Sequence, residues 1–180
     1  GANAAMLVTQ QPVLQRFWYP VMPIADLATE TPQSFELLGK KLALWLDRDR
    51  QPVAVIDYCC HRSAQLSKGK VIDGCVRCPY HGWTFNGQGA CVSVPQLNLE
   101  QPIPASYKVQ PFKCTERYGY VWVCLDQEPL LPIPYIPEAE EPGNRLIPQF
   151  YETWQCSGLR VMENSFDNAH FSFVHAASFG

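Results

Sequence analysis

Two short clusters of cysteine and histidine constrain the fold of this chain more than any other feature of its sequence. Cys59 and His61 form the first cluster, and Cys78 and His81 form the second, with the spacing C-x-H-x16-C-x2-H. Each cluster offers one thiolate and one imidazole. Two loops that face each other would bring together two thiolates and two imidazoles, which is a ligand set for a transition metal. The sequence therefore predicts a metal centre held between two loops.

The chain contains eight cysteines, and a disulfide framework is the alternative interpretation. Such frameworks are typical of short secreted domains. This chain has 180 residues, lacks the charged-then-apolar layout of a signal peptide, and groups its cysteines with histidines. These features favour metal binding in a reducing compartment, and the expected location is the cytoplasm of a bacterium or the stroma of an organelle.

Composition and charge argue against two classes of function. The net charge is −3 and the pI is about 5.8, so nothing indicates a nucleic-acid partner. No apolar run approaches the roughly 20 residues that a membrane span needs. Residues 1–5, which precede Met6, are interpreted as an expression remnant.

Two kinds of metal centre accept the predicted ligand set. A zinc ion binds four ligands in a tetrahedron, whereas a [2Fe–2S] cluster of the Rieske type takes thiolates on one iron and imidazoles on the other. Zinc fingers usually pair cysteine with cysteine, but each cluster here mixes cysteine with histidine. The C-x-H and C-P-x-H-G segments, and the gap between them, resemble the Rieske family. The resemblance implies that four residues bind the cluster: Cys59, His61, Cys78 and His81. A structural module stabilised by zinc is the alternative.

The other six cysteines are predicted to be structural. Cys60 lies between two ligands, so its side chain is expected to point away from the metal and pack. Cys75 forms a C-x-x-C pair with Cys78, but counting it as a ligand would leave His81 or Cys59 without a role. The remaining cysteines occupy strand-like positions and are expected to behave as small buried hydrophobic residues: Cys91, Cys114, Cys124 and Cys156.

Residues beside the ligands indicate a low reduction potential. High-potential members of the Rieske family carry a serine directly after the C-x-x-H-G segment and a tyrosine two positions later, and both hydroxyl groups stabilise the reduced cluster. This chain has Trp83 and Phe85 there, and neither can donate an O–H. Those members also join their loops by a disulfide, which Ala64 and Tyr80 cannot form. The resemblance implies a midpoint potential of about −150 to 0 mV.

Strand signals surround the two clusters. Four segments are predicted to be β-strands, and the last two are expected to form a hairpin through residues 117–119; the segments are 42–47, 52–58, 109–116 and 120–126. The predicted fold class is mainly β, with an antiparallel β-sandwich of the Rieske type over residues 17–127. A proline-rich linker is expected over residues 128–143. Residues 144–180, with one strand and one helix, are interpreted as the truncated start of an α+β catalytic domain.

A second group of polar residues lies near the end of the sequence, with the spacing N-x2-D-x2-H-x4-H: Asn164, Asp167, His170 and His175. Asp167 and His170 are three residues apart, which places them on one face of a helix. Two histidines are two-thirds of the 2-His-1-carboxylate triad that binds non-haem Fe(II). After a Rieske motif, this pattern resembles the oxygenase component of Rieske non-haem iron oxygenases.

The resemblance implies a role for each of these residues. His170 and His175 would bind a mononuclear Fe(II), Asn164 would line the site, and Asp167 would bridge to His81 of a neighbouring subunit in a homotrimer. The third iron ligand of the family is an aspartate farther along the chain, and no Asp or Glu follows Asp167 here. The expectation is a complete cluster domain with an incomplete mononuclear iron site.

Further segments extend the resemblance beyond the ligands: FWYPV (17–21), LLGKKLALWLDRD (37–49), CHRSAQLSKG (60–69), CPYHGWTFNGQGAC (78–91) and VPQ (94–96). They are similar to the chlorophyllide a oxygenase and pheophorbide a oxygenase group. The implied function is an oxygenase component that receives electrons from a ferredoxin or flavin reductase and uses O₂ to oxidise an aromatic or tetrapyrrole-like substrate. The choice between mono- and dioxygenation stays open. A stand-alone, low-potential Rieske ferredoxin is the alternative.

Basic residues fall close to the cluster loops: Arg62, Lys68, Lys70 and Arg77. One interpretation is a docking surface for an acidic ferredoxin. The other is an ordinary solvated rim, since exposed charges are common on any protein. The salt dependence of cluster reduction distinguishes the two interpretations.

Overall fold

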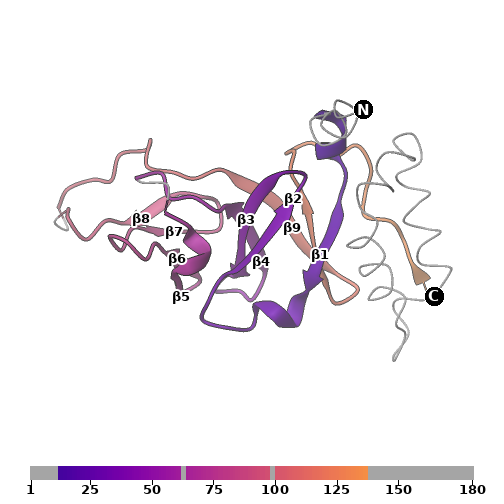
Figure 1. Cartoon of the computed structure of the whole chain (residues 1–180), viewed down its shortest axis with the longest axis horizontal. Coiled ribbons are helices and arrows are strands. Elements are labelled where there is room, and N and C mark those ends of the chain that lie inside the picture. The colour runs from indigo at the N-terminus through magenta and orange to yellow at the C-terminus, as the bar shows by residue number, and fades with distance from the viewer. Residues whose placement is uncertain (1–11, 62–63, 98–99, 138–180) are drawn as a thin grey trace, which may run out of the picture.

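The computed structural model describes residues 12–61, 64–97 and 100–137, and within these ranges the chain is built from short β-strands (Figure 1). The strands are β1 (Tyr19–Pro23), β2 (Gln33–Leu37), β3 (Lys40–Leu46), β4 (Pro52–Ile56), β5 (Lys70–Ile72), β6 (Cys75–Arg77), β7 (Thr84–Phe85), β8 (Cys91–Ser93), β9 (Pro111–Arg117) and β10 (Tyr120–Cys124). The described ranges also hold short 3₁₀ helices: η1 (Pro12–Arg16), η2 (Ile24–Leu27) and η3 (Leu66–Lys68). No helix in the described part of the chain is long and apolar enough to cross a membrane.

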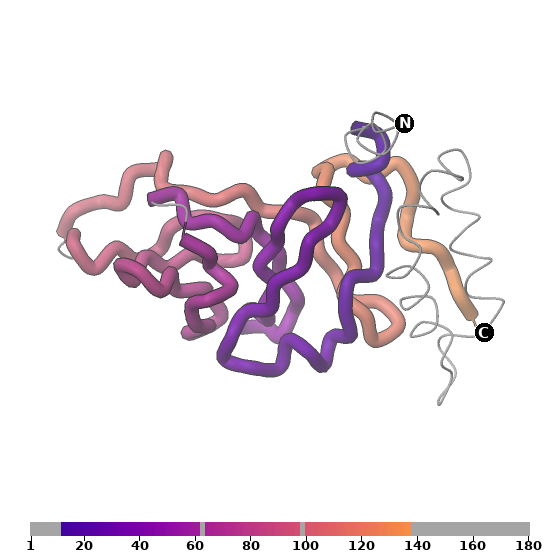
Figure 2. Tube along the Cα trace, in the orientation of Figure 1, coloured from indigo at the N-terminus to yellow at the C-terminus, as the bar shows by residue number. Residues whose placement is uncertain are grey.

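The strands form two antiparallel sheets, which confirms the prediction of a mainly β, antiparallel fold. The larger sheet has six strands in the order β1-β10-β9-β4-β3-β2, and the smaller has four in the order β5-β6-β7-β8. β4 and β9 are hydrogen-bonded neighbours, although residues 57–110 separate them in the sequence. Figures 1 and 2 show this stretch leaving the larger sheet, forming the smaller sheet at one end of the molecule, and returning to β9.

Two-residue turns that end in glycine set the register of the hairpins. The turn predicted within residues 117–119 is Tyr118–Gly119, whose φ angles are 57° and 77°. Positive φ at both residues is the type I′ geometry, which matches the twist of a hairpin. The same pattern occurs at Leu38–Gly39, between β2 and β3, and at Asp73–Gly74, between β5 and β6. The predicted strands agree with β3, β4, β9 and β10 to within two residues at each end.

Successive residues of β3 alternate between two hydrophobic cores. Leu42 and Leu44 face the core of the larger sheet, whereas Ala43 and Trp45 face a second core that the smaller sheet covers. The indole N–H of Trp45 donates a hydrogen bond to the Gly74 carbonyl at 2.9 Å, which fastens β3 to the β5–β6 turn. The second core also includes two of the predicted ligands: Cys59 and Cys78. Packing of the smaller sheet therefore holds these cysteines in place.

Gly89 gives a test of this packing, because the loop between β7 and β8 passes close to the backbone of Val109. A Cβ atom on Gly89 would lie 2.0 Å from the Val109 carbonyl oxygen, and φ is +82°. Gly39 has a similar φ of +81° but open space around its Cβ position. We expect Gly39→Ala to lower the free energy of unfolding by about 1–2 kcal/mol, the cost of a left-handed backbone. Gly89→Ala is expected to cost about 3 kcal/mol or more, since the clash adds to that cost.

Urea unfolding of the two variants beside the parent protein measures the difference. Equal losses for Gly89→Ala and Gly39→Ala would contradict the close approach of the β7–β8 loop to Val109.

Candidate metal centre

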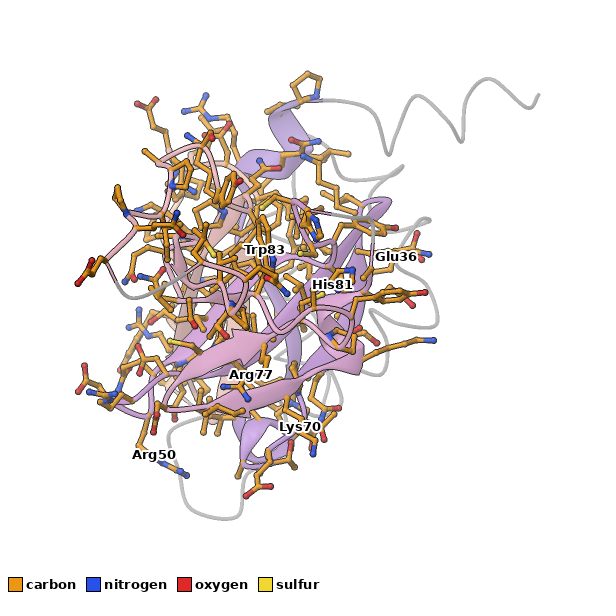
Figure 3. All side chains as sticks on the ribbon, turned by 90° about the vertical axis from the view of Figure 1, so that its left-hand side faces the viewer. Glu36, Arg50, Lys70, Arg77, His81 and Trp83 are labelled. Atoms are coloured by element: carbon orange, nitrogen blue, oxygen red, sulfur yellow. The ribbon has the colours of Figure 1, made fainter. Side chains whose placement is uncertain are left out.

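The two clusters of the sequence lie on two loops at the end of the molecule that carries the smaller sheet. Figure 3 looks onto this end and labels His81 and Trp83 near its centre. The first loop follows β4 and leads to η3, and the second connects β6 to β7. Arg62 and Ser63, within the first loop, lie outside the described residues. The structure thus brings together loops that are 16 residues apart in the sequence.

The second loop, from Cys78 to Trp83, closes on itself. The Cys78 N–H donates to the Trp83 carbonyl at 2.8 Å, and the Gly82 N–H donates to the Cys78 carbonyl at 3.2 Å. Gly82 has a φ of +75°, which a residue with a side chain rarely adopts. The local sequence C-P-Y-H-G-W is therefore sufficient to explain this turn.

The first loop is fastened at its base by a buried carboxyl group. Asp57 is only 1% exposed, and its carboxylate accepts hydrogen bonds from the Ser67 backbone N–H at 2.7 Å and the Ser67 hydroxyl at 2.6 Å. Burial raises the pKa of Asp57 above its usual value, and the bonds from Ser67 oppose that shift. Within the loop, the Cys59 N–H donates to the Ala64 carbonyl at 2.9 Å. The clamp between Asp57 and Ser67 fixes where the first loop leaves the larger sheet.

The four predicted ligands are arranged asymmetrically. Cys59 and Cys78 are buried in the second core, at 6% and 3% exposure. His61 is exposed and His81 is half-buried, and their ring centroids are 5.1 Å apart. The thiols therefore face the interior of the small-sheet region, and the imidazoles lie side by side towards its surface.

One buried atom supports a bound group. The Nε2 atom of His81 is buried and has no hydrogen-bond partner among the described residues. A buried polar nitrogen without a partner costs free energy, so such atoms are rare in folded proteins. A metal ligand is satisfied by its metal instead, and a histidine ring nitrogen is a common metal ligand.

The sequence allows two kinds of metal centre, and these differ in how their ligands are spaced. In the described part of the chain, no three Cys, His, Asp or Glu side chains converge closely enough to hold one ion. A single zinc ion needs its four ligands around one point, whereas a [2Fe–2S] cluster spreads them over two irons. The cysteines in these ranges form no disulfides. The free cysteines argue against a disulfide framework among the described residues.

The structure corrects the prediction for Cys60, which is exposed rather than packed. Its thiol lies close enough to Cys59 and Cys78 for both to affect its pKa, so it does not point away from the ligands. Partial desolvation raises the pKa of the Cys60 thiol. The physical reason is that the first loop lies at the surface, where a residue between two ligands has no core to enter.

The other cysteines in the described ranges agree with structural roles. Cys75, on β6, is half-buried, and its charged neighbours are Arg48 and Asp73 near the β5–β6 turn. Cys91 and Cys124 are buried, and burial raises the pKa of both thiols. Cys114 packs against the first core, where burial also raises its pKa. Some predicted residues lie outside the described ranges: Cys156, Asn164, Asp167, His170 and His175.

Residues that the sequence analysis missed complete the site. Tyr107 stacks on Trp83 with ring centroids 4.6 Å apart, and Trp83 stacks on His61 at 4.3 Å. Gln96 hydrogen-bonds both Trp83 and the backbone of His81. These two residues come from the return segment between β8 and β9. The VPQ segment contains Gln96, but no local pattern relates either residue to loops so far away in the sequence.

Comparison with known proteins gives a consistent result. The Rieske [2Fe-2S] domain family matches residues 17–110. Methylxanthine N1-demethylase NdmA of Pseudomonas putida is 37% identical over 177 residues, which cover 95% of this chain and 50% of the relative. The structure of Pseudomonas putida CBB5 NdmA superposes with a TM-score of 0.66 and 36% identity, covering 74% of this chain and 42% of that one.

The resemblance to the chlorophyllide a oxygenase and pheophorbide a oxygenase group is confirmed as well. Chlorophyllide a oxygenase of Chlamydomonas reinhardtii is 35% identical over 168 residues, 92% of this chain and 25% of the relative. Pheophorbide a oxygenase of Oryza sativa subsp. japonica is 33% identical over 182 residues, 88% of this chain and 32% of the relative. The matched region thus spans 50% of the length of NdmA, 25% of chlorophyllide a oxygenase and 32% of pheophorbide a oxygenase. Because these relatives are oxygenases and a demethylase, the comparison does not favour the alternative of a stand-alone electron carrier.

Proposed function

The chain belongs to the Rieske [2Fe-2S] domain family, and from this premise we propose that its two loops hold a [2Fe–2S] cluster. The proposed ligands are Cys59 and Cys78 on one iron and His61 and His81 on the other. The observation that carries the proposal is the buried Nε2 atom of His81, which lacks a protein partner among the described residues. The buried thiols and the neighbouring imidazoles support it.

For the full-length protein we propose the role of an oxygenase component of a Rieske non-haem iron oxygenase. When bound, the cluster supplies one-electron transfer, and a mononuclear iron supplies O₂ activation for oxidation of an aromatic or tetrapyrrole-like substrate. His170 and His175 would hold that iron, with Asn164 lining the site. The names of relatives that act on methylxanthine and chlorophyllide a support this substrate class. A bacterial cytoplasm or an organelle stroma is the proposed location.

The residues of this chain determine where electrons can enter. The exposed His61 and the half-buried His81 bring the imidazole edge of the site to the surface, while the core covers the thiol side. A ferredoxin or flavin reductase is the proposed donor, and it would approach this edge. In a homotrimer, Asp167 of a neighbouring subunit would contact the half-buried His81, while the donor would approach the exposed His61.

The reduction potential is the first test of this proposal. Trp83 and Phe85 are both buried, at 7% and 0% exposure, and neither carries a hydroxyl group that can donate a hydrogen bond to a cluster sulfur. Hydrogen bonds to the sulfurs raise the potential of a cluster, so their absence at these two positions favours a low value. Potentiometric titration is expected to give a midpoint of about −150 to 0 mV. A midpoint near +200 mV would contradict the low-potential assignment.

Two basic residues support docking of an acidic donor. Lys70 on β5 and Arg77 on β6 are exposed and directly opposite each other in the sheet register. Figure 3 shows both on the same end of the molecule as His81. Like charges directly opposite each other are unfavourable in a sheet, so this pair is better explained by a partner of opposite charge than by stability.

Salt dependence tests this docking surface. The rate of cluster reduction by an acidic ferredoxin is expected to fall several-fold as ionic strength rises from about 0.01 M to 0.15 M, because the Debye length shrinks from about 30 Å to 8 Å. Lys70→Ala with Arg77→Ala should lower the low-salt rate and flatten this dependence. The control is the double variant Lys113→Ala with Arg117→Ala, which removes two exposed charges on β9. It should change neither the low-salt rate nor the salt dependence. Identical salt profiles for the two double variants would favour the solvated rim.

A further inference from the structure

Gln96 lies outside both ligand loops but contacts two residues of the second one. It belongs to the turn after β8, in which the Leu97 N–H donates to the Val94 carbonyl at 3.0 Å. Its side-chain NH₂ donates to the His81 carbonyl at 3.1 Å, and its side-chain oxygen accepts from the Trp83 indole N–H at 3.1 Å. An indole N–H can only donate and a carbonyl can only accept. The orientation of the Gln96 amide is therefore fixed by its partners.

The indole that Gln96 holds is the middle ring of a stack. Trp83 lies against His61 with ring centroids 4.3 Å apart and an interplanar angle of 12°. On its other face it lies against Tyr107, at 4.6 Å and 25°. Trp83 is only 7% exposed, whereas His61 is exposed. The plane of the buried indole therefore defines the plane against which the exposed imidazole rests.

We propose that Gln96 is a positioning residue for the histidine side of the metal centre. It fixes the rotation of the Trp83 indole, and the stacked indole in turn orients the His61 ring. Through the His81 carbonyl, the same amide ties the second ligand loop to the turn after β8. One side chain thus affects the orientation of both imidazole rings. This inference rests on the proposed function, because it requires His61 and His81 to be ligands.

Ligand orientation affects the properties of a metal centre as well as its stability. Loss of the Gln96 amide is expected to let the indole rotate and the His61 ring follow it. The electronic environment of the histidine-bound iron would then change while all four ligands remain. The predicted signature is a shifted midpoint potential and altered g values in a protein that keeps its iron. A residue that only stabilises the fold would not produce that combination.

The test compares Gln96→Leu with Gln88→Leu, the same substitution at an exposed position on the β7–β8 turn. Both proteins are expected to retain the iron and sulfide content of the parent. Gln96→Leu should shift the midpoint potential and the EPR g values of the reduced protein, and Gln88→Leu should leave both unchanged. Parent values in an iron-loaded Gln96→Leu protein would overturn the inference.

Trp83→Phe provides a second route to the same interaction, because it removes the indole N–H and keeps an aromatic ring. Its effects and those of Gln96→Leu should be non-additive in the double variant, since either change alone breaks the same hydrogen bond. Fully additive shifts would overturn the inference. If the Gln96→Leu protein loses its iron, the Trp83→Phe protein is used for the test. Parent g values in the Trp83→Phe protein would then overturn the inference. A parent protein without a Rieske signal would instead refute the proposed function.

Discussion

Replacement of Cys78 by alanine in this chain is expected to abolish the [2Fe–2S] cluster. Each iron of the proposed cluster has only two ligands from the protein, so losing one thiolate leaves its iron with a single protein ligand. Cys78 is 3% exposed and follows directly after β6, so packing in the second core holds its thiol at the site. Iron content should fall from about two atoms per chain to near zero, and the visible absorption of the cluster should disappear.

Cys75→Ala is the matched control for this experiment. Cys75 is three residues before Cys78 and completes a C-x-x-C pair, yet it is half-buried on β6 with Arg48 and Asp73 as its charged neighbours. Its alanine variant is expected to keep the iron, sulfide and colour of the parent. Loss of the cluster in Cys75→Ala, or its survival in Cys78→Ala, would show that the ligands are assigned wrongly.

Replacement of Asp167 by alanine in the full-length protein is expected to reduce turnover by roughly 10- to 100-fold while both metal sites stay occupied. The proposed carboxylate joins one of the two iron-binding histidines on one subunit to His81 on its neighbour, and alanine would break that connection without removing a ligand. Asp167→Asn keeps the shape and one acceptor oxygen, so it should retain more activity than alanine. The rate at which the prereduced protein is reoxidised by O₂ with substrate present isolates this step.

Metal analysis accompanies that measurement, because loss of iron would lower turnover for a different reason. Normal iron content with slow reoxidation supports the bridge. Unchanged turnover in Asp167→Ala would remove Asp167 from the electron path, and the ligand assignment of Cys78 would not be affected.

The sequence predicts those parts of the molecule that depend on neighbouring residues. The turn from Cys78 to Trp83 is local, since Gly82 and two short backbone hydrogen bonds account for it. Likewise, the hairpin of β9 and β10 follows from one glycine, Gly119, between two runs of β-forming residues. Both were predicted because the information lies within a few residues of the structure it specifies.

Features that depend on distant contacts could not be predicted. The pairing of β4 with β9 joins strands separated by residues 57–110, and no local signal marks it. Gln96 and Tyr107 reach the ligand loops only because the return segment passes beside them. Cys60 was expected to pack because it lies between two ligands, but the loop that carries it lies at the surface. Composition and spacing do not reveal which loops face solvent.

The EPR spectrum of the purified, reduced protein tests the central claim most directly. Two thiolates on one iron and two imidazoles on the other predict a red-brown protein whose average g value after reduction lies below that of the free electron. A colourless protein with a single zinc ion per chain and no EPR signal on reduction would contradict the assignment of the two loops to an iron–sulfur cluster.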